Sequence, residues 1–188
     1  MSIFEFIMVM VSVILALALA QLLRALTEIP DSDKSCWIHS AWTAVIAFLV
    51  IQTWWAYWDL TKVEAWTFVG YLTVLSVPIG WFVLAHMLVP AARGNETDWQ
   101  AHFAKIARSF YLILLLTMAV GTLTTWAFIG APLVHPYRAF QAALISLIGI
   151  GLFVSTRKAH ALILIIYASA LLTSQLVIRM NLGALAAG

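Results

Sequence analysis

One group of polar and aromatic residues has the spacing of a helical binding face. Gln52, Trp55 and Asp59 are three and four residues apart, so their side chains share one side of a helix, with Trp58 beside them. An amide, a carboxylate and indole rings together suit a cation or a small amphipathic ligand. The same residue types also form the aromatic belt that anchors helices at the lipid–water interface. Both interpretations stay open.

A second polar pair lies near the C-terminus. Gln175 and Arg179 are four residues apart and share a helix face. If the chain crosses a membrane, Glu5 enters at the same level, and either Glu5 or Asp59 can pair with Arg179. We therefore predict a vestibule or pore mouth whose candidate residues are Gln52, Trp55, Trp58, Asp59, Gln175 and Arg179.

Histidines form the next candidate group. His39, His86, His102 and His160 each lie close to an end of a different hydrophobic stretch. Imidazole is the commonest metal ligand and can also hold haem iron. Histidine also tolerates the membrane interface, and no two of these residues have the i, i+4 spacing that would place them on one helix face. We therefore predict no cofactor and keep a metal or haem site at these histidines as an alternative.

A third polar cluster ends the first hydrophobic stretch. Gln21, Arg24 and Glu28 share one helix face. Arg24 and Glu28 are an i, i+4 pair that can simply neutralise each other. Binding of a lipid phosphate or an anionic substrate is the other interpretation.

Motifs of enzymes are missing from the sequence. It has no glycine-rich phosphate loop, no His-Glu-x-x-His and no Ser-His-Asp candidate, so we expect a protein that is not an enzyme. Its single cysteine, Cys36, excludes an internal disulfide. Pro78 should kink the third hydrophobic stretch and free a backbone carbonyl. Ala142, Ser146 and Gly149 share a face that would let another helix approach closely.

The composition shows what must position these residues. Of 188 residues, 64% are hydrophobic and 10% are charged, and the mean hydropathy is +1.00. Soluble domains carry roughly 25% charged residues. Most of this surface must therefore face lipid or other helices. The net charge of +2 is too small to suggest a nucleic-acid partner.

Six long stretches without charge each reach the length at which a segment can cross a bilayer. We predict one transmembrane domain over 1–188, an all-α bundle of six spans at about 4–28, 36–59, 66–90, 103–130, 137–157 and 159–182. Strands are excluded because the stretches do not alternate polar and apolar residues as a barrel requires. The first stretch lacks the basic start of a signal peptide, so we expect it to be retained.

Basic residues predict the orientation, since cytoplasmic loops are enriched in Lys and Arg. With six spans, one side receives Arg24, Lys34, Arg93, Lys105, Arg108, Arg157 and Lys158, and the other receives Lys62, Arg138 and Arg179. The first side is therefore predicted to be cytoplasmic, with both termini on the opposite, non-cytoplasmic side.

Three segments carry a family resemblance: Ile3-Phe4-Glu5-Phe6, Gln21-Leu22-Leu23 and Gln52-x-x-Trp55-x-x-Trp58-Asp59. With these segments the chain resembles small multi-pass membrane proteins of bacteria whose function is unknown. The resemblance implies the bacterial inner membrane and says nothing about activity.

Three functions fit the sequence. The first is an oligomeric channel or facilitator for an ion or small solute, in which Gln52, Thr117, Thr124, Ser146, Thr173 and Gln175 would converge on one lumen. The second is a non-catalytic subunit of a larger membrane complex, and the third is a metal- or haem-binding redox protein. We rank them in that order, with lipid and a second copy of the chain as the expected partners.

Overall fold

The structure is a computed structural model that describes residues 2–28, 36–89, 98–129 and 136–178. Within these ranges the chain is all-α. Its elements are α1 (Ile3–Glu28), α2 (Trp37–Ala56), the short 3-10 helix η1 (Tyr57–Lys62), α3 (Phe68–Leu88), α4 (Trp99–Ile129), α5 (Pro136–Gly151) and α6 (Arg157–Ile178).

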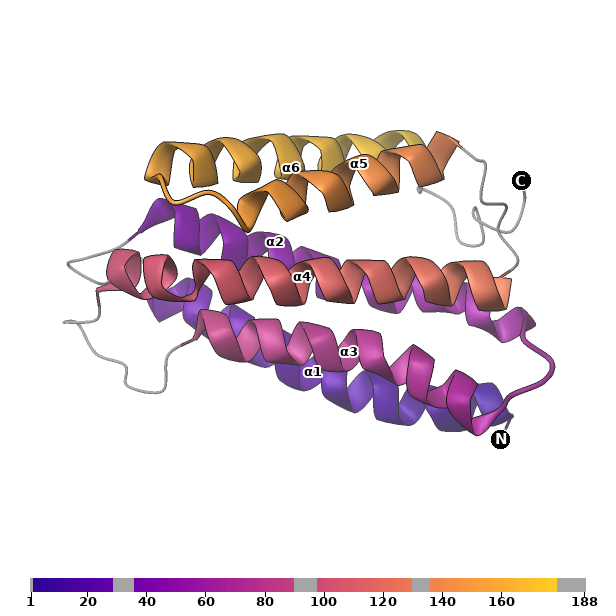
Figure 1. Cartoon of the computed structure of the whole chain (residues 1–188). Helices are drawn as coiled ribbons and strands as arrows, with labels where there is room; N and C mark the ends of the chain where they lie inside the picture. The colour runs from indigo at the N-terminus through magenta and orange to yellow at the C-terminus, as the bar shows by residue number, and fades with distance from the viewer. Residues whose placement is uncertain (1, 29–35, 90–97, 130–135, 179–188) are drawn as a thin grey trace.

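The α-helices lie side by side and alternate in direction along the bundle (Figure 1). We call the end at which α1 begins and α6 ends the terminal end. The opposite end carries Arg24, Lys105, Arg108, Arg157 and Lys158, and we call it the basic end. The first and last described helical residues therefore lie at the same end of the bundle.

Five helical segments are long and apolar enough to cross a membrane: Ile3–Glu28, Trp37–Lys62, Phe68–Leu88, Trp99–Phe128 and Arg157–Gln175. Together with the composition, they identify the chain as a multi-pass integral membrane protein. The remaining helix, α5, has 16 residues and is about 24 Å long at 1.5 Å per residue. It is shorter than the hydrocarbon core of a bilayer, which is about 30 Å thick.

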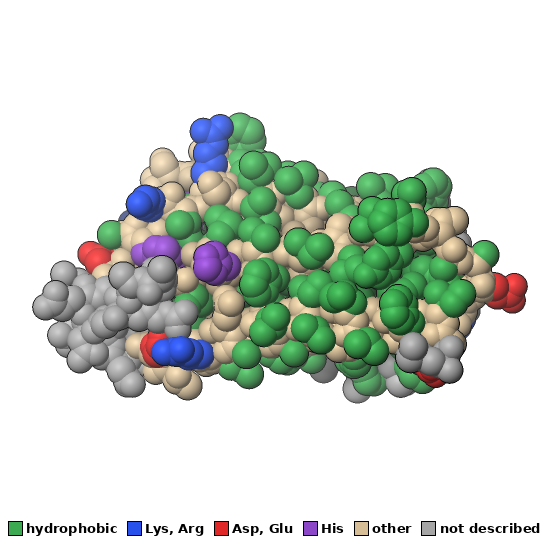
Figure 2. Space-filling view, turned by 90° about the horizontal axis from the view of Figure 1, so that it is seen from below, with side chains coloured by type: hydrophobic (Ala, Val, Ile, Leu, Met, Phe, Trp, Pro, Cys, Tyr) green, Lys and Arg blue, Asp and Glu red, His purple; other side chains and the backbone are tan. Residues whose placement is uncertain are grey.

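The outer surface is apolar over the middle of the bundle. Large hydrophobic side chains such as Phe6, Leu17, Leu72 and Leu116 are exposed. On the face shown in Figure 2, charged side chains lie toward the two ends and hydrophobic side chains cover the space between them. This is the surface that a lipid-embedded protein requires, since charge is costly within the hydrocarbon layer.

Helix starts are fixed by local hydrogen bonds. Ser2 and Glu5 form a reciprocal capping box: the Ser2 N–H donates to the Glu5 carboxylate at 2.8 Å, and the Glu5 N–H donates to Ser2 Oγ at 3.1 Å. Asp98 caps α4 by accepting from the Ala101 N–H at 2.8 Å. The carboxylate of Glu5, which the sequence offered as a partner for Arg179, thus caps α1; Arg179 lies outside the described residues.

The helix predicted over 137–157 ends earlier, at Gly151. A Cβ atom at Gly151 would lie 2.6 Å from the Tyr111 ring, so the glycine allows close contact between α5 and α4. Beyond it, residues 152–153 form a turn and residues 154–156 have no regular secondary structure. Thr156 then accepts from the N–H groups of Ala159 and His160 and begins α6.

Candidate functional site

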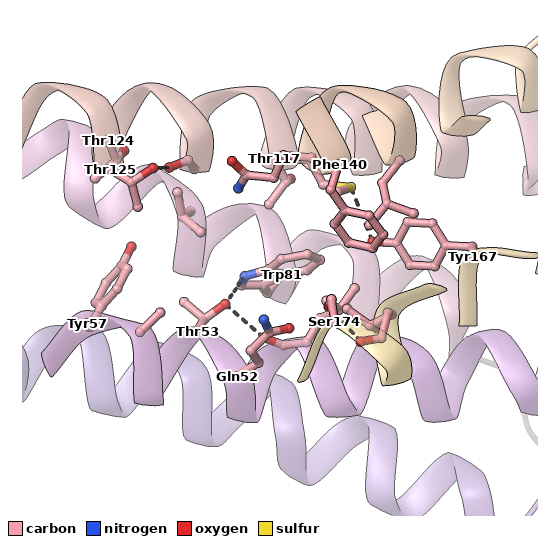
Figure 3. A pocket seen from close by; sticks show the side chains of 18 of the residues that line it. Gln52, Thr53, Tyr57, Trp81, Thr117, Thr124, Thr125, Phe140, Tyr167 and Ser174 are labelled. Carbon is pink, nitrogen blue, oxygen red and sulfur yellow. Dashed lines mark hydrogen bonds between the residues drawn. The ribbon is translucent and has the colours of Figure 1, made fainter. Parts of the chain in front are cut away.

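A cavity of about 130 Å³ lies in the half of the bundle nearer the terminal end, and we call it the chamber. Side chains from every element except α1 line it (Figure 3). Its polar lining consists of Gln52, Thr53, Tyr57, Trp81, Thr117, Thr124, Thr125, Gln141, Tyr167 and Ser174. The chamber therefore combines hydroxyl and amide groups with an otherwise apolar wall.

Gln52 brings an unpaired acceptor to the chamber. Its side chain extends from α2 toward the side of the chamber where Trp81 lies (Figure 3). Within the described part of the chain, its buried Oε1 atom has no hydrogen-bond partner. A buried amide oxygen without a partner costs about 1–3 kcal/mol. The side chain must turn before a molecule in the chamber can donate to this oxygen, because the atom itself is buried.

Threonines of α4 supply further acceptors. Thr117 Oγ1 donates to the Ile113 carbonyl at 2.8 Å, and Thr124 Oγ1 donates to the Val120 carbonyl at 2.9 Å. Because each hydroxyl proton is used within the helix, the oxygen faces its surroundings as an acceptor. Residues of this kind suit a solute that donates hydrogen bonds.

The proline of α3 shapes the chamber wall. Pro78 has no N–H, so the carbonyl four residues earlier, that of Val74, loses its partner within the helix. Tyr57 replaces that partner: its hydroxyl donates to the Val74 carbonyl at 2.7 Å, and the tyrosine is buried. The carbonyl freed by the proline therefore holds η1 against α3 rather than facing the chamber.

Two further contacts fix α3 to its neighbours. Trp81 Nε1 donates to Thr53 Oγ1 at 2.8 Å, which joins α3 to α2 (Figure 3). A Cβ atom on Gly80 would clash with Thr117 Oγ1, so only glycine fits at this contact between α3 and α4. The chamber thus has a rigid side formed by α2, α3 and α4.

Arg138 places positive charge behind the opposite wall. Its Nη1 atom donates to Thr125 Oγ1 at 2.9 Å and to Gln141 Oε1 at 3.0 Å, and both acceptors line the chamber. The arginine is buried, with 9% of its surface exposed. Among the residues that the structure describes, no carboxylate lines the chamber.

Packed rings close the chamber toward the basic end. Trp42, Phe110, Tyr111 and Tyr167 are fully buried, and Trp42 contacts the other three with ring centroids 5.2–5.8 Å apart. Tyr167 belongs to both this layer and the chamber lining. No other residue of the layer lines the chamber, so the described residues form a chamber that ends at these rings.

The histidines lie beyond this aromatic layer. His39 Nε2 is 2.8 Å from the Leu88 carbonyl and His102 Nε2 is 3.0 Å from the Met87 carbonyl, so both histidines cap the last turn of α3. His160 Nδ1 lies 3.2 Å from the Tyr111 hydroxyl, and His86 is exposed. The described residues contain no group of three or more His, Cys, Asp or Glu that could hold a metal ion.

The predicted vestibule residues separate in the structure. Gln52 lines the chamber, whereas Trp55 and Trp58 are exposed on the outside, where a lipid anchor would be. Asp59 is buried and lies 3.7 Å from the Lys62 ammonium group. Gln175 donates to Ser174 Oγ at 3.4 Å at the edge of the chamber, and Arg179 lies outside the described residues.

The remaining predicted polar residues lie elsewhere. Arg24 and Glu28 form an ion pair at 2.6 Å, with the half-buried Gln21 one turn before them. Ser146 and Thr173 are exposed and donate to their own helices, so neither contributes to a lumen within one copy of the chain.

Sequence reasoning missed several residues that line the chamber or lie directly behind its wall. Tyr57, Trp81, Arg138 and Gln141 were not candidates, although the i, i+3 spacing of Arg138 and Gln141 indicates a shared helix face. Tyr57 could have been found by asking which donor satisfies the carbonyl that Pro78 frees.

Comparison of the chain with protein-family models, curated proteins and solved structures gives no match. The fold and the chamber are therefore the basis for assigning a function.

Proposed function

We propose that this protein is a membrane facilitator that takes a small, neutral, hydrogen-bond-donating solute into the chamber. The observation that carries the proposal is the Gln52 amide: the residue lines a cavity, and its buried side-chain oxygen has no hydrogen-bond partner among the described residues. A purely structural bundle would fill such a space with packed side chains, because interiors are close-packed.

The size of the chamber limits the solute. A cavity of about 150 Å³ accommodates benzene, and a water molecule occupies about 30 Å³ of liquid volume. The chamber, at about 130 Å³, thus holds a solute of roughly six heavy atoms by the same comparison. Small polyols and small amides are of this size.

The chemistry of the lining selects neutral solutes. Threonine hydroxyl oxygens and Gln52 Oε1 provide acceptors, and Arg138 adds positive charge behind Thr125 and Gln141. Among the described residues, no charged side chain lines the chamber. We therefore place glycerol and urea ahead of sodium or potassium as solutes to test.

Solute flux into proteoliposomes tests the proposal. The purified protein is reconstituted, and stopped-flow light scattering follows swelling with glycerol, urea and an uncharged sugar of twice the size. We expect glycerol or urea to enter faster than in protein-free liposomes and the sugar to show no difference. Equal rates with and without protein for every small solute would overturn the proposal.

Gly121 offers a matched pair of variants. A Cβ at this chamber-lining position would be 3.9 Å from Val77 Cγ2, so alanine fits without displacement. Leucine at the same position would extend into the chamber. We expect Gly121→Ala to keep the flux and Gly121→Leu to abolish it. Unchanged flux through a folded Gly121→Leu protein would show that solute does not pass through the chamber.

We also propose the orientation and the membrane. The described basic end carries Arg24, Lys105, Arg108, Arg157 and Lys158 against Lys62 and Arg138 near the terminal end. This asymmetry supports a cytoplasmic basic end and non-cytoplasmic termini in a bacterial inner membrane. This orientation requires a sixth crossing of the membrane, made by α5 together with residues 152–156. The position of α5 beside α4 and α6 supports such a crossing (Figure 1).

The outer face of α5 supports self-association. Ala142 and Ser146 are exposed, and a Cβ on Gly149 would meet nothing within 4 Å. Small residues on a lipid-facing helix allow another helix to pack closely. We therefore propose that facilitator units pair through α5, which native mass spectrometry in detergent would detect as a discrete oligomer.

A further inference from the structure

A second cavity, of about 470 Å³, opens at the basic end, and we call it the basic groove. It lies where α5 stops at Gly151 while α4 and α6 continue toward the basic end (Figure 1). The non-helical residues 152–155 form one side of the groove, and α4 and the start of α6 form the other sides. In lipid, non-helical backbone is tolerated where it is buried in protein or lines a polar cavity.

The depth of the groove matches the lipid headgroups. From Ser109 to Ile129, α4 is charge-free and about 30 Å long at 1.5 Å per residue, which equals the hydrocarbon core. Arg108, which immediately precedes this stretch, therefore lies at the edge of the hydrocarbon. Arg157 is the first residue of α6 and, with Lys158, precedes the long charge-free stretch of that helix, so it lies at the same depth. Arg108 and Arg157 both line the groove.

The polar side of the groove is cationic. Arg108 and Arg157 line it, and the Arg157 guanidinium is fixed by donating to Gln100 Oε1 at 3.0 Å. The N–H groups of Arg157 and Lys158, the first two of α6, have no acceptor within the helix and add positive potential. Among the described lining residues there is no carboxylate to neutralise these charges. Guanidinium groups bind phosphate through paired hydrogen bonds.

The other side of the groove is apolar and continuous with lipid. Ile38, Phe103, Ala107 and Leu152 line it, and Phe153 has 87% of its surface exposed. A free phosphate ion would gain nothing from these residues. A phospholipid uses both sides, because its phosphate can contact the arginines while an acyl chain covers the apolar wall.

We infer that the basic groove is a binding site for an anionic phospholipid, with the lipid phosphate held by Arg108 and Arg157. This site is separate from the chamber and does not depend on the proposed solute.

Native mass spectrometry of the protein released from detergent tests this inference. Phosphatidylglycerol and phosphatidylcholine with identical acyl chains are added separately, and retained lipid is measured. We expect the wild type to retain phosphatidylglycerol preferentially. The variant R108Q/R157Q should lose that preference about thirtyfold, since each of the two basic residues at the membrane surface contributes about 1 kcal/mol.

The matched control is K105Q/K158Q, which removes the same charge from neighbouring positions that do not line the groove. We expect this variant to keep most of the preference. Equal losses in the two variants would overturn the inference, because they would indicate general attraction to the basic end. Equal retention of the two lipids by the wild type would also overturn it, as would displacement of phosphatidylglycerol by an equal concentration of inorganic phosphate.

Discussion

Replacing Tyr57 by phenylalanine tests how the chamber wall is held together. The change removes the hydroxyl that donates to the Val74 carbonyl at 2.7 Å and leaves that carbonyl buried. Hydrogen bonds in membrane proteins contribute about 0.6 kcal/mol on average and up to about 1.7 kcal/mol. The cost is toward the upper part of that range when the lost hydrogen bond leaves a buried carbonyl without a partner. We expect Tyr57→Phe to lower the free energy of unfolding by about 1 kcal/mol.

Pro78 makes this prediction specific. In a Pro78→Ala background the new N–H donates to the Val74 carbonyl within the helix, so the carbonyl no longer needs the tyrosine. In that background Tyr57→Phe should lower the free energy of unfolding by less than about 0.3 kcal/mol. The coupling energy between positions 57 and 78 is then nearly as large as the cost of Tyr57→Phe in the wild type. Unfolding in mixtures of mild detergent and SDS, followed by tryptophan fluorescence, measures all four proteins. An equal cost of Tyr57→Phe in both backgrounds would refute the reasoning.

Two further predictions concern helix contacts. Gly151→Ala should destabilise the protein by about 1–3 kcal/mol, since its Cβ would clash with the Tyr111 ring. In the monomeric protein Gly149→Ala should be neutral or stabilising, because its Cβ meets nothing within 4 Å in one copy of the chain. The same unfolding assay compares these variants, and equal effects would contradict the packing described. His39→Ala removes the group that caps the Leu88 carbonyl and leaves a space among buried rings, so it should cost about 2–4 kcal/mol. Protease accessibility near the end of α3 should increase, and a stability equal to that of the wild type would exclude the capping role.

The sequence was sufficient for the membrane class and for the helical architecture, because charge and hydropathy report lipid contact directly. The early end of α5 was not predicted. Residues 152–156 remain uncharged and largely apolar, so hydropathy alone continues the helix through them. In the structure α5 ends at Gly151, which packs against the Tyr111 ring, and hydropathy does not report such a contact between helices.

The site was predicted only in part, for a related reason. Helical spacing places residues on a face but does not say whether that face points toward lipid or protein. Gln52 and Trp55 were therefore grouped together, although Gln52 lines the chamber and Trp55 is exposed. The sequence likewise did not predict that His39 and His102 contact the carbonyls at the end of α3, because those contacts join residues from different helices.

The most direct test of the central claim, that the chamber admits small polar solutes, is the accessibility of cysteines placed in it. In a Cys36→Ala background, Thr117→Cys and Thr124→Cys test two lining positions, and Leu116→Cys tests an exposed position on the same helix. Each protein in liposomes is treated with iodoacetamide, a small neutral amide. We expect the lining cysteines to react much faster than the one at position 116, and glycerol or urea to slow their reaction. Equal reaction rates at all three positions would contradict the claim.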